Sequence, residues 1–594
     1  MDPLFAAGLI VTAATAAPVL VQMLRQPRGL FVLFFAEMWE RFSYYGMRGL
    51  LIFYLTEHFL FGDRAAQGQY GAYTSLAYLA PLFGGVLADR LLGTRKAATF
   101  GALLLVAGHF AMAIEGPPAT QILRYGEKSY LFEGRGSGAA REVRVKVGDG
   151  LYPIALSAGG AMTLKGLPPN ADLPAVLPKG AYALEVIAVP PFYRNLLYLA
   201  LSLIIVGVGL LKPNISSIAG QLYAEGDPRR DSGFTLYYYG INLGAFWAAI
   251  ACGWLGQTIG WWAGFGAAGV GMLAGLVVFI VGKPWLDGKG EPPEPARLAA
   301  PLLGALTRER AIYLCALIAV GVVWALVQRF AAVGFMLAAA SAATLLYLSV
   351  FMAKFCTKIE RARLMLALVL IASSVVFWTL FEQAGTSLNQ FAERNVNLGV
   401  GAFSMTAAQT QSFNAGFVLI LAPLFAGLWA MLGRRGADPN PVAKFGFALI
   451  QAGLGFFALV WGAEFADANA RIPLMFLALA YLLHTTGELC LSPVGLSQMT
   501  RLSPAATLST LMATWFLATS WAQWIGGRIA QLTAAETIAG AALDSEAALK
   551  TYAHVFALIG AWGIAAGALL LLASPWLKRW ADSNASDPPA PRDN

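Results

Sequence analysis

The sequence predicts an all-α integral membrane protein made of two six-helix bundles, with an extra helix pair between them and a small β-rich insertion. Of its 594 residues, 58% are hydrophobic and only 12% are charged, whereas soluble domains carry about 25% charged residues. Apolar runs of about 20 residues, the length that crosses a bilayer, fill most of the chain. This composition excludes nucleic-acid-binding, disordered and secreted disulfide-rich proteins.

The apolar runs fall into two sets of six, which is the layout of a transporter whose paired halves face a central path. The first set is expected to span the membrane near residues 29–55, 70–88, 97–114, 193–221, 231–256 and 262–283. The second set is expected near residues 361–388, 408–433, 441–463, 472–497, 505–532 and 550–577.

These sets define an N-terminal bundle over 29–283 and a C-terminal bundle over 361–578. Residues 284–360 between them begin as a polar linker and continue into two more apolar runs, near 311–328 and 331–353. Because the extra runs come as a pair, they leave the topology of the second half unchanged. We expect a connecting hairpin there, outside the substrate path.

Residues 1–28 precede the first bundle and contain an apolar run at 3–24. A cleaved signal peptide is not expected, because the start carries Asp2 and no positively charged region. We interpret the run as an extra spanning helix with its N-terminus outside.

Residues 115–191 are too polar to span a membrane and lie inside the N-terminal half. Stretches such as REVRVKV and KGAYALEV alternate apolar and polar residues, which is the pattern of half-buried strands. We expect a small β-rich domain on the extracytoplasmic face. A plain insertion is favoured over a docking module, although an unknown partner of this segment remains open.

Charge placement predicts the orientation. Lys and Arg exceed Asp and Glu by 41 to 33, and they cluster on alternate loops, as cytoplasmic loops do. These clusters lie near 25–28, 90–96, 229–230, 308–310, 354–363, 434–435 and 578–579. The protein is therefore expected in the cell (inner) membrane, with a cytoplasmic tail at 579–594.

Few chemically reactive groups remain for enzymatic or metal chemistry. The four cysteines lie in apolar runs without a CxxC pair, so neither a disulfide nor a metal framework is expected. No GxSxG, HExxH or P-loop motif is present. We expect no catalytic residue and no cofactor, and His58, His109, His484 and His554 are interpreted as structural.

Charged residues inside spans are informative, since each costs about 2.5–3.5 kcal/mol on insertion scales. Six polar residues of the first span share one stripe roughly 140° wide at about 100° per residue. They are Glu37, Glu40, Arg41, Tyr44, Tyr45 and Arg48. A purely structural ion pair does not need so many polar groups on one face of a helix. The stripe therefore favours a functional role in the interior of the bundle.

Three later spans carry one charge each, namely Lys212, Glu382 and Glu488. If the spans meet, four carboxylates face three cations. The carboxylates are Glu37, Glu40, Glu382 and Glu488, and the cations are Arg41, Arg48 and Lys212. One carboxylate in excess suits a site that binds a proton, because burial disfavours an unpaired charge.

The run from Glu37 to Gly46, EMWERFSYYG, resembles the ExxERFxYYG signature of proton-dependent oligopeptide transporters, within the major facilitator superfamily. The resemblance extends from Gly29 to about Trp576. Further matching motifs are GGVLADRLLGTRK, LLKPNIS, FTLYYYGINLGAF, GELCLSPVGLS and TWFLATS. The helix pair at 311–353 is similar to one found in bacterial members.

The resemblance implies roles in proton coupling. Glu37, Glu40 and Arg41 would form a coupling cluster with Lys212. Glu382 would change partners as the halves rock, which would link the proton to gating. Asp89 and Arg90 would act at the cytoplasmic gate.

The resemblance also implies a di- or tripeptide as substrate. Arg48 and Lys212 would attract the peptide carboxylate, and Glu488 would bind the amino terminus. Hydrogen bonds to the peptide would come from Tyr44, Tyr78, Asn242, Asn414 and Ser492, and Trp515 would wall a side-chain pocket. The implied partners are peptide, protons and the lipid bilayer, with no nucleic acid.

Three other readings stay open. The chain could carry another small zwitterion or amino acid, or act as a non-transporting peptide sensor. A membrane-embedded enzyme that uses the buried glutamates is the least favoured, since no catalytic motif accompanies them.

Overall fold

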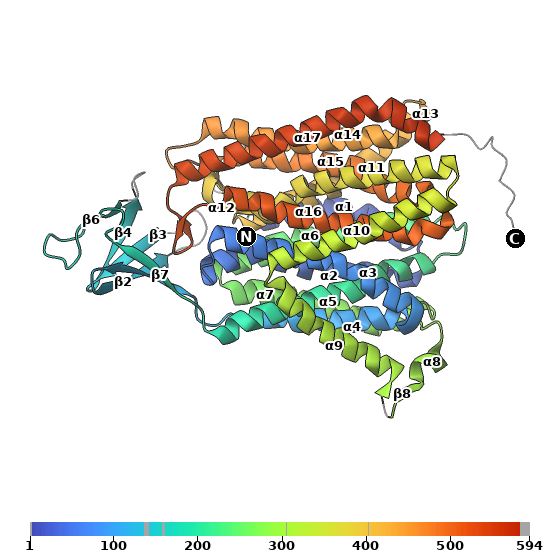
Figure 1. The fold of residues 1–594 in the computed structure, drawn as a ribbon, viewed down its shortest axis with the longest axis horizontal. Helices are drawn as coiled ribbons and strands as arrows, with labels where there is room; N and C mark the ends of the chain where they lie inside the picture. The colour runs from blue at the N-terminus through green and yellow to red at the C-terminus, as the bar shows by residue number, and fades with distance from the viewer. Residues whose placement is uncertain (1–2, 136–141, 157–160, 305, 402, 583–594) are drawn as a thin grey trace.

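A computed structural model describes residues 3–135, 142–156, 161–304, 306–401 and 403–582. It consists of a body of long helices with a β-sheet projecting from one end (Figure 1). The predicted fold class is confirmed. Residues 583–594, most of the expected cytoplasmic tail, lie outside the described part of the chain.

The N-terminal helices follow the expected spans closely. They are α1 (Pro3–Met23), α2 (Arg28–Phe53), α3 (Asp63–Leu87), α4 (Thr94–Met112), α5 (Pro191–Gln221), α6 (Arg230–Thr258) and α7 (Trp261–Val281). Helices α2 and α3 each continue into a π-helical turn, η1 (Tyr54–His58) and η2 (Ala88–Leu92). Helix α3 begins at Asp63 rather than near residue 70. The apolar pattern missed this start because the first turns of the helix are polar.

The C-terminal helices also match the expected order. They are α11 (Lys358–Phe381), α12 (Ser387–Asn395), α13 (Ser412–Arg434), α14 (Pro441–Gly462), α15 (Leu474–Leu502), α16 (Leu508–Ala530) and α17 (Ser545–Asp582). Local sequence fixes several starts. A capping box of Thr357 and Glu360 begins α11, and the Asn440 side chain accepts a hydrogen bond from the Ala443 amide in the first turn of α14.

The span expected at 361–388 is interrupted in the structure. Helix α11 ends at Phe381, a 3-10 turn η5 covers Glu382–Gly385, and α12 continues to Asn395. Thr386 at the break has φ −126° and ψ −99°, outside the helical region. The break places Glu382 at a bend instead of on a helix face.

The segment between the bundles forms the expected helix hairpin. It contains η4 (Lys283–Leu286), α8 (Pro295–Ala299), β8 (Pro301–Leu303), β9 (Leu306–Thr307), α9 (Arg308–Val327) and α10 (Phe330–Phe355). Helix α9 packs on α5 and α3, and α10 packs on α16 and α3. The hairpin therefore lies on the outside of the two bundles.

Length and hydropathy identify 11 helices among the described residues that are able to cross a membrane. Helices α2, α4, α6 and α16 fall outside this set. Helix α2 carries Glu37, Glu40, Arg41 and Arg48, so the helix richest in buried charge is also one that hydropathy alone misses.

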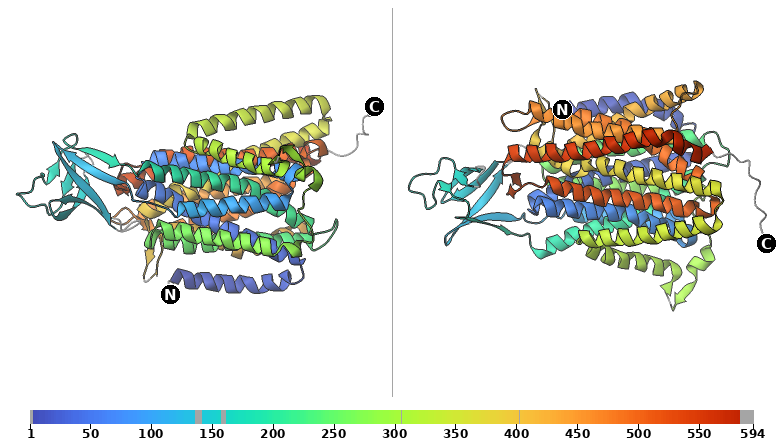
Figure 2. Two further views of the ribbon diagram at one scale, coloured as in Figure 1. Left: turned by 90° about the horizontal axis from the view of Figure 1, so that it is seen from below. Right: turned by 45° about the horizontal axis from the view of Figure 1, so that its top comes forward.

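Helix α1 lies against the outside of the bundles, with its first residues toward the end that bears the sheet (Figure 2). It contacts α6 of the first half and α13 of the second. Thr15 Oγ1 lies 2.8 Å from the Tyr239 hydroxyl, and the Trp247 indole donates to Thr12 Oγ1 at 3.0 Å. The extra helix thus packs along the seam between the halves.

The expected β-rich insertion is a seven-stranded antiparallel sheet in the order β6-β5-β4-β3-β2-β1-β7. Its strands are β1 (Thr120–Tyr125), β2 (Lys128–Arg135), β3 (Glu142–Val147), β4 (Gly150–Leu156), β5 (Met162–Leu164), β6 (Val176–Leu177) and β7 (Ala183–Ile187). The remaining short strands are β10 (Val396–Asn397), β11 (Gly399–Val400), β12 (Phe403–Ser404), β13 (Ile472–Pro473), β14 (Thr537–Ile538) and β15 (Ala541–Ala542).

The sheet does not stand alone. Its apolar core, with Leu123 and Phe132, includes Ile538 and Ala539 from the β14–β15 hairpin of the C-terminal half. The Ala539 amide donates to Gln121 Oε1 at 2.6 Å. An insertion in the first half is therefore packed against the second half at one end of the molecule.

Small residues set the closest helix contacts within the bundles. A Cβ added to Gly84 of α3 would lie 2.0 Å from the Gly209 carbonyl oxygen of α5. Only glycine permits this approach, which is how helices without a hydrophobic driving force pack tightly in lipid.

Candidate binding site between the two bundles

A buried ionic cluster lies on α2, on the polar stripe that the sequence indicates. The Arg41 guanidinium donates to Glu37 Oε1 at 2.8 Å, and its Nε lies 3.1 Å from Glu40 Oε2. The Tyr237 hydroxyl of α6 donates to Glu37 Oε2 at 2.8 Å. The cluster thus joins α2 to α6, with the side chain of Glu40 at 0% exposure.

Glu37 and Glu40 differ in how their charge is compensated. Glu37 accepts hydrogen bonds on both oxygens, whereas neither oxygen of Glu40 accepts one from any described residue. Glu40 has the nearby charge of Arg41, which lies within ion-pair distance but outside hydrogen-bond geometry, and the more distant charge of Lys212. Buried charge without hydrogen bonds is costly, because no water replaces the lost solvation.

A second ion pair crosses between the bundles. Arg48 of α2 donates to Glu382 at the break after α11, and its Nε donates to the Tyr70 hydroxyl of α3 at 2.8 Å. Gly385 makes room for this group, since a Cβ there would lie 2.1 Å from the Tyr70 oxygen. The pair is buried, with side-chain exposures of 5% and 7%.

Beside this pair lies a cavity of about 190 Å³ that both bundles line. Six of the predicted site residues contribute to its walls. They are Arg48, Tyr78, Asn242, Glu382, Asn414 and Glu488. A guanidinium from α2 and a carboxylate from α15 therefore face one space.

The carboxylate on the C-terminal side is held in place by a neighbour. Asn414 of α13 donates to Glu488 Oε2 at 3.1 Å and also to Thr485 Oγ1 at 3.0 Å. The Asn414 side-chain amide thus holds one oxygen of the Glu488 carboxylate, which lines the cavity.

The structure places the other predicted residues outside the cavity lining. Lys212 lies 4.4 Å from the centre of the Tyr78 ring and has no ion pair among the described residues. Tyr44 is buried edge-on against Tyr45. Trp515 packs on Gly495, where an added Cβ would meet its ring at 2.4 Å.

The remaining predicted residues also lie outside the cavity lining. Ser492 is half-buried on α15. Asp89 and Arg90 are exposed on η2, at the end of α3. Glu37, Glu40 and Arg41 form the separate cluster on α2 described above.

Several cavity residues were not predicted from the sequence. They are Tyr238, Trp378, Gln411, Tyr481 and His484, whereas Tyr45 lies on the stripe that the sequence indicated. Tyr238 belongs to the YYY run of a quoted motif, so a signal was present, but nothing distinguished it from its neighbours. The His484 ring shares a hydrogen bond of 3.0 Å with the Ala452 carbonyl, in line with a structural histidine.

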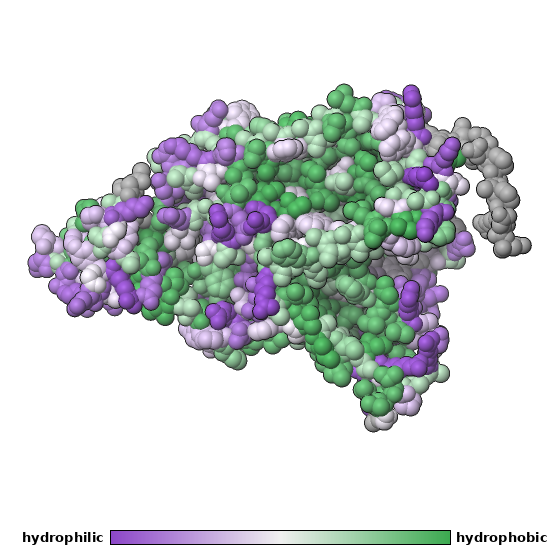
Figure 3. Space-filling model, viewed as in Figure 1, coloured by the Kyte–Doolittle hydropathy of each residue, from purple (hydrophilic) through white to green (hydrophobic). Residues whose placement is uncertain are grey.

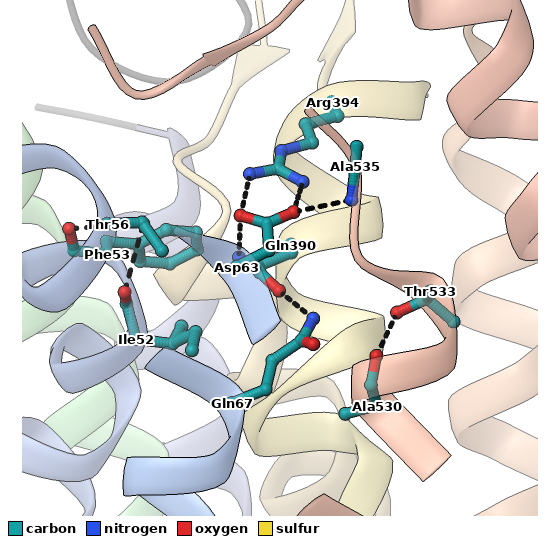
Figure 4. A network of polar contacts seen from close by, with 10 residues as sticks. All are labelled: Ile52, Phe53, Thr56, Asp63, Gln67, Gln390, Arg394, Ala530, Thr533 and Ala535. Atoms are coloured by element: carbon teal, nitrogen blue, oxygen red, sulfur yellow. Dashed lines mark hydrogen bonds and ion pairs between the residues drawn. The ribbon is translucent and has the colours of Figure 1, made fainter. Parts of the chain in front are cut away.

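A second inter-bundle network lies toward the end that bears the sheet (Figure 4). Arg394 of α12 donates to both oxygens of Asp63 of α3, at 2.6 and 2.8 Å. Gln390 and the Ala535 amide donate to the same carboxylate, at 3.2 and 3.0 Å. Side-chain exposures of 1% and 6% make this a fully buried pair, which no sequence motif indicated.

No group of three or more His, Cys, Asp or Glu residues in the described ranges is placed to hold a metal ion.

Comparisons with known proteins identify transporters that are similar to this chain. The model of the POT family matches residues 95–545. The uncharacterised transporter YclF of Bacillus subtilis is 34% identical, with 93% of this chain and 94% of the relative covered. The peptide transporter YePEPT of Yersinia enterocolitica is 31% identical over 85% of this chain and 87% of its own.

A solved structure is similar over nearly the full length. A mutant of the peptide transporter POT in complex with alafosfalin superposes with a TM-score of 0.69 at 31% identity. The alignment covers 93% of this chain and 96% of that one.

The Asp63–Arg394 pair yields a stability prediction. Replacing either residue alone by alanine leaves a buried charge without its partner, which costs about 3–5 kcal/mol. The double replacement removes both charges, and we expect it to cost much less than the two single losses together. The measurement is a double-mutant cycle of the free energy of unfolding in detergent.

The exposed pair Glu546–Lys550, with side chains 72% and 75% exposed, is the matched control. Its cycle is expected to give a coupling of about 1 kcal/mol or less. Additive losses at Asp63 and Arg394 would contradict the interpretation that this pair is energetically coupled.

Proposed function

The chain belongs to the POT family, and from that premise we propose that it is a proton-coupled symporter that imports di- and tripeptides by alternating access. The observation that carries the proposal is the cavity between the bundles, with Arg48 on one wall and Glu488 on the other. A short zwitterionic peptide has one charge of each sign at a nearly fixed separation, and these two groups complement its ends. A purely anionic substrate would be repelled by Glu488.

The rest of the cavity suits a ligand with constant ends and variable side chains. Tyr78, Trp378 and Tyr481 provide aromatic walls that accept many side chains. A cavity of about 190 Å³ is below the range of about 300–1,000 Å³ of drug-sized pockets, which favours short peptides. We assign Asn242 and Asn414, which line the cavity, to peptide hydrogen bonding. Tyr44 and Ser492 as hydrogen-bonding groups and Trp515 as a side-chain wall lie outside the lining here, and we assign them to the peptide in another conformation of the cycle.

Proton coupling is assigned to Glu37, Glu40, Arg41, Lys212 and Glu382. Glu40 supports the assignment, because its buried carboxylate accepts no hydrogen bond from the described residues. Glu382 supplies the link to substrate. A proton on Glu382 removes the charge that holds Arg48, and the freed guanidinium then binds the peptide carboxylate.

Alternating access requires the two halves to separate at each end in turn. Arg48–Glu382 at the cavity wall and Asp63–Arg394 join the halves, together with a hydrogen bond from Asn389 to the Gly49 carbonyl at 3.0 Å. We propose that these contacts form the closed gate of the conformation described. Asp89 and Arg90 are assigned to the gate at the opposite end.

We further propose that the protein lies in the cell (inner) membrane with the sheet outside and the C-terminus inside. The sheet and the last turn of α17 are at opposite ends of the body (Figure 1). The proposed units are a helix at 1–28, bundles at 29–283 and 361–578, an insertion at 115–191 and a connecting region at 284–360.

The proton-coupling assignment is tested by uptake of a labelled dipeptide into proteoliposomes under an imposed pH gradient. Glu37→Gln and Lys212→Ala are each expected to abolish uphill accumulation, because they remove a titratable group and a charge from the coupling cluster. The control is Glu464→Gln, at an exposed glutamate after α14. Uphill uptake that survives both substitutions would overturn the proposal.

Glu488→Gln tests how the amino terminus is recognised. We expect the affinity for a zwitterionic dipeptide to fall by roughly 10- to 100-fold, because a hydrogen bond to a charged group contributes about 1.5–3 kcal/mol. The N-acetylated dipeptide, which has no positive end, is expected to bind both proteins equally weakly. Binding is measured by competition against the labelled dipeptide, and an equal loss for both ligands would count against the assignment.

A further inference from the structure

A second, larger cavity lies outside the central path. It has a volume of about 530 Å³ and is bounded by α3, α5, α9 and Met336 of α10. In the space-filling view it is the hollow between the diagonal α9 and the body, with hydrophobic walls and hydrophilic residues at one end (Figure 3). Its position behind the extra hairpin separates it from Arg48 and Glu488.

The walls of the hollow are apolar, as expected for a site that faces lipid. Leu79 and Phe83 of α3, Leu210 of α5 and Ala319 of α9 line the hollow, and Phe83 is 72% exposed. The lining on α9 extends from Arg308 to Leu326, which is about 27 Å at 1.5 Å per residue. That length exceeds half of the roughly 30 Å hydrocarbon core, so one acyl chain fits along it.

One end of the hollow is cationic. Arg90, Arg297 and Arg308 line it there, together with Glu294. Arg297 is paired with Glu294 at 3.4 Å. Arg90 and Arg308 make no side-chain ion pair with any residue in the described part of the chain, so two positive charges remain uncompensated.

Neighbouring cations at the same end are already compensated. Arg95 pairs with Glu291 at 2.8 Å, and Lys96 pairs with Glu309 at 2.7 Å. The Arg95 guanidinium holds the pKa of the Glu291 carboxyl below its usual range through hydrogen bonds to it. Unlike these two neighbours, Arg90 and Arg308 present positive charge at the mouth of the hollow that is unpaired among the described residues.

We propose that this hollow binds an anionic phospholipid, with an acyl chain along α3, α5 and α9 and the phosphate against Arg90 and Arg308. A soluble anion would satisfy the arginines but leave the apolar walls unused. A zwitterionic lipid would fill the walls but add no net negative charge at the mouth. Basic pockets between spanning helices bind anionic headgroups in the same way.

The bound lipid would fill the space between the α9–α10 hairpin and the N-terminal bundle. Helix α9 contributes only a few buried residues, such as Ala316 and Val320, to its contact with the bundle. Lipid in the hollow would add contact area to this interface and stabilise the hairpin. The proposal does not depend on the transported substrate.

Cys315 offers a direct readout, because it lines the hollow and is exposed. Delipidated full-length protein in detergent is treated with a maleimide, and labelling of each cysteine is followed by peptide mass spectrometry. Phosphatidylglycerol is expected to slow labelling of Cys315 at least fivefold at concentrations where phosphatidylcholine does not. Labelling of Cys356, outside the hollow, is expected to stay constant.

The variant Arg308→Ala removes one of the two arginines that face the phosphate, and it is expected to raise the phosphatidylglycerol concentration needed for protection at least tenfold. Arg434→Ala, an exposed arginine at the end of α13, is the matched control. Ala319→Phe fills the hollow and is expected to abolish lipid protection in a protein with unchanged thermal unfolding.

Three results would overturn the proposal. One is equal protection by phosphatidylglycerol and phosphatidylcholine. The second is protection by glycerol phosphate or inorganic phosphate alone, which would indicate a soluble-anion site. The third is an unchanged phosphatidylglycerol requirement in the Arg308→Ala variant.

Discussion

The two halves of this protein are joined by charges that the membrane interior does not allow to stand alone. Arg48 and Glu382 come from opposite bundles, and so do Asp63 and Arg394. In a region without bulk water, removing one partner of such a pair costs several kcal/mol. The halves can therefore separate at these two ion pairs only when other charges or protons take the place of the lost partners.

This constraint connects the fold to transport. A proton neutralises a carboxylate, and a peptide carboxylate offers a guanidinium a new partner. In the proposed cycle, the two together would replace both sides of the Arg48–Glu382 pair without leaving an unpaired charge. The break of α11 at Glu382 and the absence of a side chain at Gly385 bring this carboxylate close enough to Arg48 for the exchange. The insertion adds a further contact between the halves, because its core contains Ile538 and Ala539 of the opposite half.

Much of the architecture could be predicted from local patterns. Apolar runs located the helices, alternation located the sheet, and the rare charges inside spans located Arg48, Glu382 and Glu488. The rest depended on contacts between distant segments. Asp63 and Arg394 each lie just beyond an apolar run, where a charge is expected to be solvated and gives no signal. Arg90 and Arg308 were interpreted as part of a cytoplasmic charge bias, and only the packing of α9 against α3 and α5 shows that they share one hollow.

The central claim is that Glu382 competes with the peptide for Arg48. The most direct measurement is the dipeptide affinity of the unaltered protein and of Glu382→Gln under the same conditions. The account predicts that Glu382→Gln binds the dipeptide more tightly, because Arg48 no longer has a carboxylate partner that the peptide must displace. An affinity of Glu382→Gln equal to or weaker than that of the unaltered protein would contradict it.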